Sequence, residues 1–256
     1  MSAAQRDDDA PARRSRKIPL EHAVLWRPLW CSNHLLVGLV RPDQRRFWLF
    51  AAQQALAAVQ DDAAERGAQA CGLLAGALYE CPTTGVEYQV IGAARALADP
   101  GVLYPAATEL RHARLREARE ALDADGQTVL GWYAWRPRLE TRLEAADEAL
   151  FASGFERSYH VGLALSPQEG GIFAYERKLG RSFSIPFREL LPPDGSPSDE
   201  PPLSVVGWDN YVSAVPVRRV QPAERGGTRT LSGALPERRG VVAGAVAAIR
   251  GLVGGR

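Results

Sequence analysis

Lysine and cysteine are scarce in this sequence. Of its 31 basic residues only Lys17 and Lys178 are lysines, and this arginine bias, with the many alanines, indicates a GC-rich and bacterial coding sequence. The three cysteines, Cys31, Cys71 and Cys81, form no CxxC pair. An odd number of cysteines without such a pair argues against both a disulfide framework and a zinc ribbon.

Long apolar runs are also missing. No stretch approaches the roughly 20 apolar residues that a membrane-spanning helix needs, and the polar N-terminus contains no apolar signal-peptide core. We therefore expect a cytoplasmic protein without a transmembrane segment. The 31 basic and 30 acidic residues leave a formal net charge of +1, so no overall field attracts nucleic acid and no specific nucleic-acid partner is expected. No GxGxxG, P-loop or GxSxG motif occurs.

The composition is that of a globular protein, with 46% hydrophobic and 24% charged residues in a chain of 256. Changes in composition along the chain predict five segments. These are a disordered N-terminus (1–17), an N-terminal arm (18–45), a central domain (46–190), a Pro-rich linker (191–202) and a C-terminal extension (203–256). The extension contains an arginine-rich segment followed by a terminal amphipathic one.

Within the central domain, helical and strand patterns alternate irregularly. Apolar periodicity predicts helices over 46–64, 109–124 and 139–154. Strands are predicted for the hairpin 70–80 and 86–97, and then for 128–135, 159–166, 171–177 and 181–187. This order indicates the α/β (α+β) class, a mixed sheet flanked by helices.

Two sequence blocks and one aspartate of this domain have a familiar spacing. The blocks are QACGLLAG at 69–76 and GWYAWRP at 131–137, and Asp147 follows eleven residues after Arg136. This arrangement resembles the JAMM (MPN-type) metallopeptidase family. In that family the first strand reads E-x-C-G-L-L-x-G, the central strand ends in G-W-Y-H-S-H-P, and an aspartate follows eleven residues after the second histidine. The resemblance covers about 145 residues and implies an MPN-like fold.

The resemblance also implies a zinc site that this sequence has lost. In the family two histidines and the aspartate hold zinc, a zinc-bound water attacks, a glutamate acts as general base and a serine supports the oxyanion. The corresponding positions here are Gln69 for the glutamate, Ala134 and Arg136 for the histidines, Glu144 for the serine, and the retained Asp147. Alanine offers no ligand atom, and arginine places a fixed positive charge where the metal would bind. We therefore expect no metal, no cofactor and no catalytic residue.

The replacements suggest a structural substitute for the metal. Arg136 can pair with Asp147 or with Glu144 and fill the former metal position, because a buried aspartate without a partner is costly. The alternative is that Asp147 lies on the exposed side of its helix.

The flanking segments carry candidate residues for binding a partner. Trp26 and Trp30 give the N-terminal arm the aromatic content of a buried contact. In the terminal segment, one helical face carries Val242, Val246, Ile249 and Val253. We expect a protein partner and a homo- or hetero-oligomer, and the partner could be an MPN-type protein, a ubiquitin-like protein or a particle or shell subunit.

Three functions remain in competition. The first is a non-catalytic MPN-like scaffold or adaptor subunit that mediates protein–protein interactions in a larger bacterial assembly. The second is an adaptor that binds a ubiquitin-like protein or a peptide tail in the former substrate groove, with Arg136 as a contact. The third is an enzyme of altered, metal-independent chemistry that uses Arg136, Glu144 and Asp147.

Overall fold

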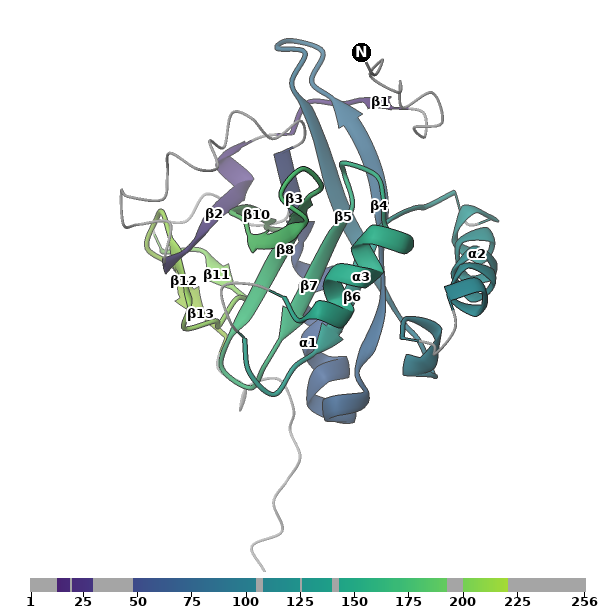
Figure 1. Ribbon diagram of the computed structural model, residues 1–256. Helices are drawn as coiled ribbons and strands as arrows, with labels where there is room; N and C mark the ends of the chain where they lie inside the picture. Colours follow the sequence, from purple (N-terminus) through teal and green to yellow (C-terminus); the bar gives the residue numbers. More distant parts are fainter. Residues whose placement is uncertain are drawn as a thin grey trace, which may run out of the picture. The chain divides into compact units, whose positions relative to one another are not determined.

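The computed structural model describes residues 13–18, 20–29, 48–104, 108–124, 126–139, 143–192 and 200–220. The chain divides into two compact units, Met1–Gln221 and Pro222–Arg256, and every described residue belongs to the first. That unit combines one large mixed sheet, a small separate sheet and α-helices (Figure 1), which confirms the predicted α+β class. None of the helices in the described part is both long and apolar enough to cross a membrane.

The elements have the following bounds. The strands are β1 (Arg14–Ser15), β2 (Ala23–Pro28), β3 (Trp48–Ala52), β4 (Cys71–Glu80), β5 (Glu87–Ala96), β6 (Thr128–Trp135), β7 (Val161–Leu165), β8 (Gly170–Glu176), β9 (Arg181–Ser184), β10 (Phe187–Leu190), β11 (Leu203–Ser204), β12 (Tyr211–Ser213) and β13 (Arg218–Arg219). The α-helices are α1 (Gln53–Arg66), α2 (Thr108–Ala124) and α3 (Ala145–Ser153). Short 3₁₀ turns cover Leu20–His22, Gly67–Gln69 and Pro100–Val102.

Eleven of these strands form one sheet. Its order is β12-β2-β10-β3-β5-β4-β6-β7-β8-β9, with β1 paired to β4 outside this path. Parallel pairs join β1 to β4, β3 to β5, β3 to β10 and β6 to β7. The sheet curls so that strands near its two ends come into contact. The Tyr211 hydroxyl of β12 accepts a hydrogen bond from the backbone N–H of Ile172 in β8 at 3.3 Å.

A hydrophobic core lies on each face of the sheet. Leu74 belongs to the core on the inner, concave face, which also contains Leu56 of α1. Its neighbour Leu73 belongs to the core on the opposite face, together with Leu115 of α2 and Leu150 of α3. Successive strand residues point to opposite faces, so β4 contributes to both cores. In Figure 1, α3 lies in front of β6 and β7.

The glycines of the two sequence blocks permit close packing of strands. A Cβ on Gly131 would lie 1.8 Å from the carbonyl oxygen of Val161 on the adjacent strand. A Cβ on Gly72 would lie 2.2 Å from the carbonyl oxygen of Arg95 and 2.3 Å from the ring of Tyr133. Only glycine fits at these approaches, which gives a physical reason for the glycines in CGLLAG and GWY.

Several predicted elements match the structure. The hairpin forms between β4 and β5, with Gly85 in its turn at φ 64°. Helix α2 and strand β6 also have the expected positions. The predicted helix over 46–64 is wrong at its start, since residues 48–52 form β3 between two parallel neighbours and the helix begins at Gln53. A short buried apolar run is compatible with either a strand or a helix. Here the run forms a strand because it can pair with the edges of both β5 and β10.

Two later predictions also need correction. The segment 181–187 covers two strands, because Ile185 and Pro186 separate β9 from β10: β9 is the last strand of the path, whereas β10 lies between β2 and β3. The third helix begins at Ala145, so Leu139 and Leu143 precede it although both pack on the outer core.

A buried glutamate connects the flanking segments to the sheet. Glu189 of β10 has no exposed surface. Its carboxylate accepts hydrogen bonds from Trp26 Nε1 at 2.9 Å, Gln53 Nε2 at 3.1 Å, Ser204 Oγ at 2.5 Å and Val205 N at 2.9 Å. The segments predicted as an arm and as the start of an extension therefore contribute β2, β11 and β12 to the same folded unit as residues 46–190.

Candidate functional site

The end of β6 and the first turn of α3 hold the positions that the sequence singled out. Ala134 is 1% exposed and, two residues before Arg136, shares its face of the strand. The backbone N–H of Arg136 donates to the carbonyl of Leu165 at 2.6 Å, which keeps the chain beside β7. Asp147 lies in the first turn of α3, where the positive end of the helix dipole stabilises a carboxylate.

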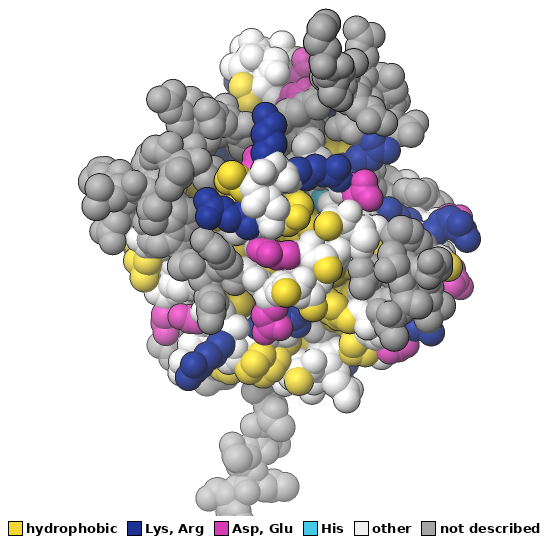
Figure 2. Space-filling model, in the orientation of Figure 1, with side chains coloured by type: hydrophobic (Ala, Val, Ile, Leu, Met, Phe, Trp, Pro, Cys, Tyr) yellow, Lys and Arg dark blue, Asp and Glu magenta, His cyan; other side chains and the backbone are white. Residues whose placement is uncertain are grey.

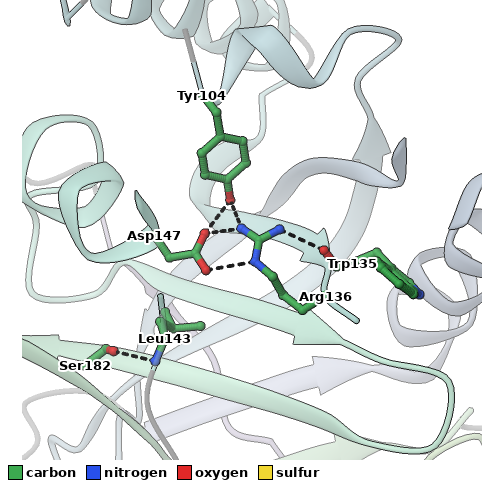
Figure 3. Close-up of polar contacts among 6 residues, drawn as sticks. All are labelled: Tyr104, Trp135, Arg136, Leu143, Asp147 and Ser182. Atoms are coloured by element: carbon green, nitrogen blue, oxygen red, sulfur yellow. Dashed lines mark hydrogen bonds and ion pairs between the residues drawn. The ribbon is translucent and has the colours of Figure 1, made fainter. Parts of the chain in front are cut away.

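Arg136 and Asp147 form a bidentate ion pair (Figure 3). Arg136 Nε donates to Asp147 Oδ2 at 3.0 Å, and a terminal nitrogen of the same guanidinium donates to Oδ1. The Asp147 side chain has no exposed surface, and that of Arg136 is 15% exposed. The predicted pairing with Asp147 is confirmed, whereas the alternative of an exposed Asp147 is wrong. Glu144 is exposed and is not the partner.

Tyr104 completes the cluster from a loop that the sequence did not connect to it. Its hydroxyl donates to Asp147 Oδ1 at 2.6 Å and accepts from Arg136 NH2 at 2.7 Å. The preceding 3₁₀ turn is capped by Asp99, whose Oδ1 accepts from the N–H of Gly101 at 2.8 Å. The fully buried Leu103 fixes the loop in the outer core. No local sequence signal connects Tyr104 to Arg136, because they meet only through the packing of this loop.

The electrostatics of the cluster keep its groups in one protonation state. Burial on its own lowers the pKa of Arg136, but the hydrogen bond to Asp147 and the charges of Tyr104 and Asp147 raise it, and the net pKa lies above the ordinary value. Burial, and then the charge of Asp147, raise the pKa of Tyr104 well above its usual value. At neutral pH the guanidinium is charged and the phenol is protonated.

The N-terminal turn of α3 is held by a second set of contacts. Ser182 of β9 donates to Glu148 Oε1 from its backbone nitrogen at 2.9 Å and from its hydroxyl at 3.0 Å. The same hydroxyl accepts from the N–H of Leu143 at 3.1 Å. These bonds position the helix that carries Asp147, and Figure 3 shows the one between Ser182 and Leu143.

The remaining predicted site residues lie apart from this cluster or outside the described residues. Gln69 is exposed in its 3₁₀ turn, and the next residue, Ala70, accepts a hydrogen bond from the N–H of Trp135 at 2.9 Å. The prediction of Trp26 as a partner contact needs correction, because the structure buries it completely with its Nε1 bonded to Glu189. Trp30, Val242, Val246, Ile249 and Val253 lie outside the described residues.

The residues present do not fit the zinc ion that the resemblance would place here. Asp147 is the one ligand retained, and both of its carboxylate oxygens are bonded to Arg136. Position 134 offers no ligand atom. Among the residues that the structure describes, no three His, Cys, Asp or Glu side chains are grouped as metal ligands.

A second cluster of the same composition was missed by the sequence analysis. Arg66 Nε and NH2 donate to the two oxygens of Asp62 at 2.6 and 2.7 Å, and the Tyr133 hydroxyl donates to Asp62 Oδ2 at 2.9 Å. Asp62 and Arg66 are four residues apart on α1, a spacing that brings helix side chains together, so the sequence did carry a signal for this pair.

A third arrangement, on the outer face of β10 and β3, was also missed. The Arg188 guanidinium lies 4.5 Å from the centroid of the Trp48 ring and 5.8 Å from that of Phe50. Elsewhere on the surface, the face in Figure 2 shows acidic side chains lying among the basic ones.

The comparisons with known proteins add little to this picture. No family model matches the chain, and no curated protein matches it. Among solved structures, the chain is similar to a protein from Salinibacter ruber determined in solution, with 16% identity and a TM-score of 0.36 over 57% of this chain and 92% of that one.

Proposed function

We propose that this chain is a non-catalytic scaffold or adaptor subunit, derived from a JAMM/MPN-type fold, that mediates protein–protein interactions in a larger bacterial assembly. The observation that carries the proposal is the Arg136–Asp147 ion pair. By the resemblance, positions 134, 136 and 147 correspond to the three zinc ligands. In this correspondence the guanidinium of Arg136, bound to both oxygens of Asp147, is the cation that takes the place of the metal ion.

The contacts of Arg136 support a structural role for the cluster. The guanidinium donates to Asp147 twice, to Tyr104 once, and through NH1 to the carbonyl of Trp135 at 2.8 Å. Arginine has five N–H donors, and four of them are used within the protein. Such a group stabilises the packing of β6 against α3 and has little capacity left for a substrate.

The protonation states support the same conclusion. Hydrolysis needs an activated water or nucleophile and a base with a pKa near the working pH. A phenol with a strongly raised pKa and a guanidinium with a raised pKa do not take that role at neutral pH. The groove-binding adaptor and the altered enzyme both require Arg136 to reach a ligand, for which it has a single unused N–H donor as long as it stays paired with Asp147.

Restoring the two histidines tests the equivalence of positions. The variant Ala134→His/Arg136→His recreates the H-x-H pattern, with Asp147 retained. We expect it to bind about one zinc ion per chain in elemental analysis and titration calorimetry, since structural and catalytic zinc sites need at least three such ligands. The matched variant Ala134→His/Arg136→Ala, with one histidine fewer, should bind far more weakly. Equal zinc binding by the two variants would show that these positions do not converge on a metal site.

A second experiment tests the scaffold function itself. The chain, tagged at its native locus, is purified with its partners and the stoichiometry is measured by native mass spectrometry. Wild type is compared with Arg136→Met/Asp147→Leu, which removes the charges while keeping side-chain volume. A scaffold retains the same complex in both forms. A folded double variant that loses its partner would show that the cluster itself binds it, and a wild-type chain that is purified as a lone monomer would contradict the scaffold function.

A further inference from the structure

The outer face of the sheet around β2, β10 and β3 carries a compact group of exposed residues. Along β2, Trp26 points into the inner core, so Arg27 points outward, and Leu29, directly after the strand, is exposed. Val212 of β12 is directly opposite Arg27 in the antiparallel ladder and therefore shares this face. On the other side Arg188 of β10 lies over Trp48 of β3. We call these five residues the arginine–tryptophan face.

Within the part of the chain that the structure describes, the two arginines of this face have no acidic partner. Neither Arg27 nor Arg188 forms an ion pair with an Asp or Glu of the described residues. Leu25 pairs with Arg188 in the ladder, so Arg27 is the diagonal neighbour of Arg188 on the same face. Burial, followed by the charge of Arg27, lowers the pKa of Arg188. The face therefore holds two neighbouring positive charges, one of them partly withdrawn from water.

The apolar members of the face are exposed. Trp48 is 39%, Val212 41% and Leu29 48% exposed. Within the described residues, neither hydrophobic core contains any member of this face. Tryptophan and arginine are the residue types that dominate binding energy at protein interfaces, and an arginine stacked on an aromatic ring is already oriented for a carboxylate.

We propose that the arginine–tryptophan face docks an acidic segment of a partner protein, with carboxylates on Arg27 and Arg188 and an apolar anchor against Trp48 and Val212. This inference rests on the proposed scaffold function and specifies where and by what chemistry a partner binds. A carboxylate that pairs with Arg188 keeps much of its attraction in salt, because the guanidinium is half-buried and salt screens a partly buried ion pair less than an exposed one. Two arginines with one tryptophan and two aliphatic side chains form a small patch, unlike the extended groove of basic residues and successive aromatic rings that follows a nucleic-acid backbone.

A selection from a library of short random peptides tests the chemistry without knowledge of the partner. The target is the purified full chain, compared with the double charge reversal Arg27→Glu/Arg188→Glu. A matched control, Arg116→Glu/Arg138→Glu, makes the same change in net charge at two exposed arginines elsewhere. Circular dichroism establishes that each variant is folded.

We expect wild type and the control to enrich peptides that combine Asp or Glu with an apolar residue. The Arg27→Glu/Arg188→Glu variant should bind the enriched peptides at least about tenfold more weakly, and its own selection should shift toward basic peptides. Peptides without an acidic excess, or equal binding to this variant and to wild type, would overturn the proposal. So would a single-stranded oligonucleotide that binds wild type more tightly than the selected peptides do.

The same variants separate this inference from the function on which it rests. If the complex purified from cells survives Arg27→Glu/Arg188→Glu unchanged, its partner docks elsewhere; the face assignment then fails while the scaffold function stands. If wild type forms no complex and no acidic peptide is enriched, both fail.

Discussion

Two arginines of the same sheet have opposite surroundings. Arg136, at the end of β6, is bonded to Asp147, Tyr104 and a backbone carbonyl, and its side chain is 15% exposed. Arg188, within β10, lies on Trp48 and has no carboxylate partner among the described residues. Both are charged side chains withdrawn from water to a large degree.

The difference shows how partners decide what a charged residue does. The donors of Arg136 are nearly all used, so removing it leaves a buried carboxylate without a counter-charge. Among the described residues no carboxylate pairs with Arg188, so we expect its removal to cost the fold little and to deprive the outer face of its proposed binding group. We therefore expect the first arginine to hold the structure together and the second to contact a partner. Four predictions test this contrast, in decreasing order of the expected change in stability.

The largest effect should come from Arg136→Ala. This variant leaves Asp147, with no exposed surface, facing Tyr104 alone. Breaking a buried pair by removing one partner typically costs about 3–5 kcal/mol. We expect the free energy of unfolding, measured by urea denaturation, to fall by this amount.

The double variant Arg136→Met/Asp147→Leu is the control for this effect. Replacing a buried pair by apolar residues of similar volume is often neutral or stabilising, so most of the lost stability should return. A double variant as unstable as the single one would show that packing around Arg136, and not the unpaired carboxylate, is responsible.

His160 gives the opposite case, a buried group beside which the described residues place no acidic counter-charge. Its Nδ1 accepts from the N–H of Arg157 at 3.1 Å. Burial, and then the charge of Arg119, lower its pKa from 6.5 to about 3. Between these values the unfolded chain binds a proton that the folded chain does not, so stability falls as the pH drops below 6.5. Linkage gives a loss of about 3 kcal/mol at pH 4 from this group.

His160→Gln removes the titrating group and should flatten this part of the profile. The measurement is urea denaturation of both proteins from pH 7.5 to 4. Carboxylates titrate in both proteins, so the difference between the two slopes isolates the histidine. Parallel profiles would mean that His160 is protonated in the folded state.

Arg66 should fall between the two arginines of the comparison. It bonds to Asp62 and to the carbonyls of Leu97 and Cys71, but its side chain is 23% exposed and that of Asp62 is 11% exposed. Water can partly solvate Asp62 when Arg66 is removed. We expect Arg66→Met to cost about 1–2 kcal/mol in thermal or urea unfolding. A cost equal to that of Arg136→Ala would show that exposure does not set the difference.

The smallest effect on stability is expected for Arg188→Ala. A cation–π contact contributes about 0.5–1 kcal/mol, and relief of an unpaired, half-buried charge offsets part of that loss. The free energy of unfolding should therefore change by less than about 1 kcal/mol, while binding of acidic peptides falls. A loss of several kcal/mol would mark Arg188 as structural and remove the contrast with Arg136.

Local patterns of the sequence predicted a good part of this fold. Pro82 to Gly85 marked the hairpin turn between β4 and β5, and TVLGWYAW corresponds to β6. The pairing of Arg136 with Asp147 was expected because a buried aspartate without a partner is costly. These features depend on residues that are close in sequence or on a spacing that is itself informative.

Other features had no local signal. Residues 48–52 form a strand because β5 and β10 flank them, although their own pattern suits a helix. Trp26 looked like a surface anchor, but Glu189, 163 residues away, accepts its N–H within the core. Tyr104 reaches Arg136 only through the loop that Leu103 fixes.

The sequence by itself determined the α+β class and the glycine positions where strands approach closely. Only the tertiary structure decided which arginine is paired and which is open. The physical reason is that the state of a charged side chain depends on burial and on partners from distant segments. Positions 136 and 188 hold the same amino acid. The packing of α3 and of the loop at Tyr104 against β6 gives Arg136 a structural role, whereas Arg188 lies on the outer face of β10 and stays accessible.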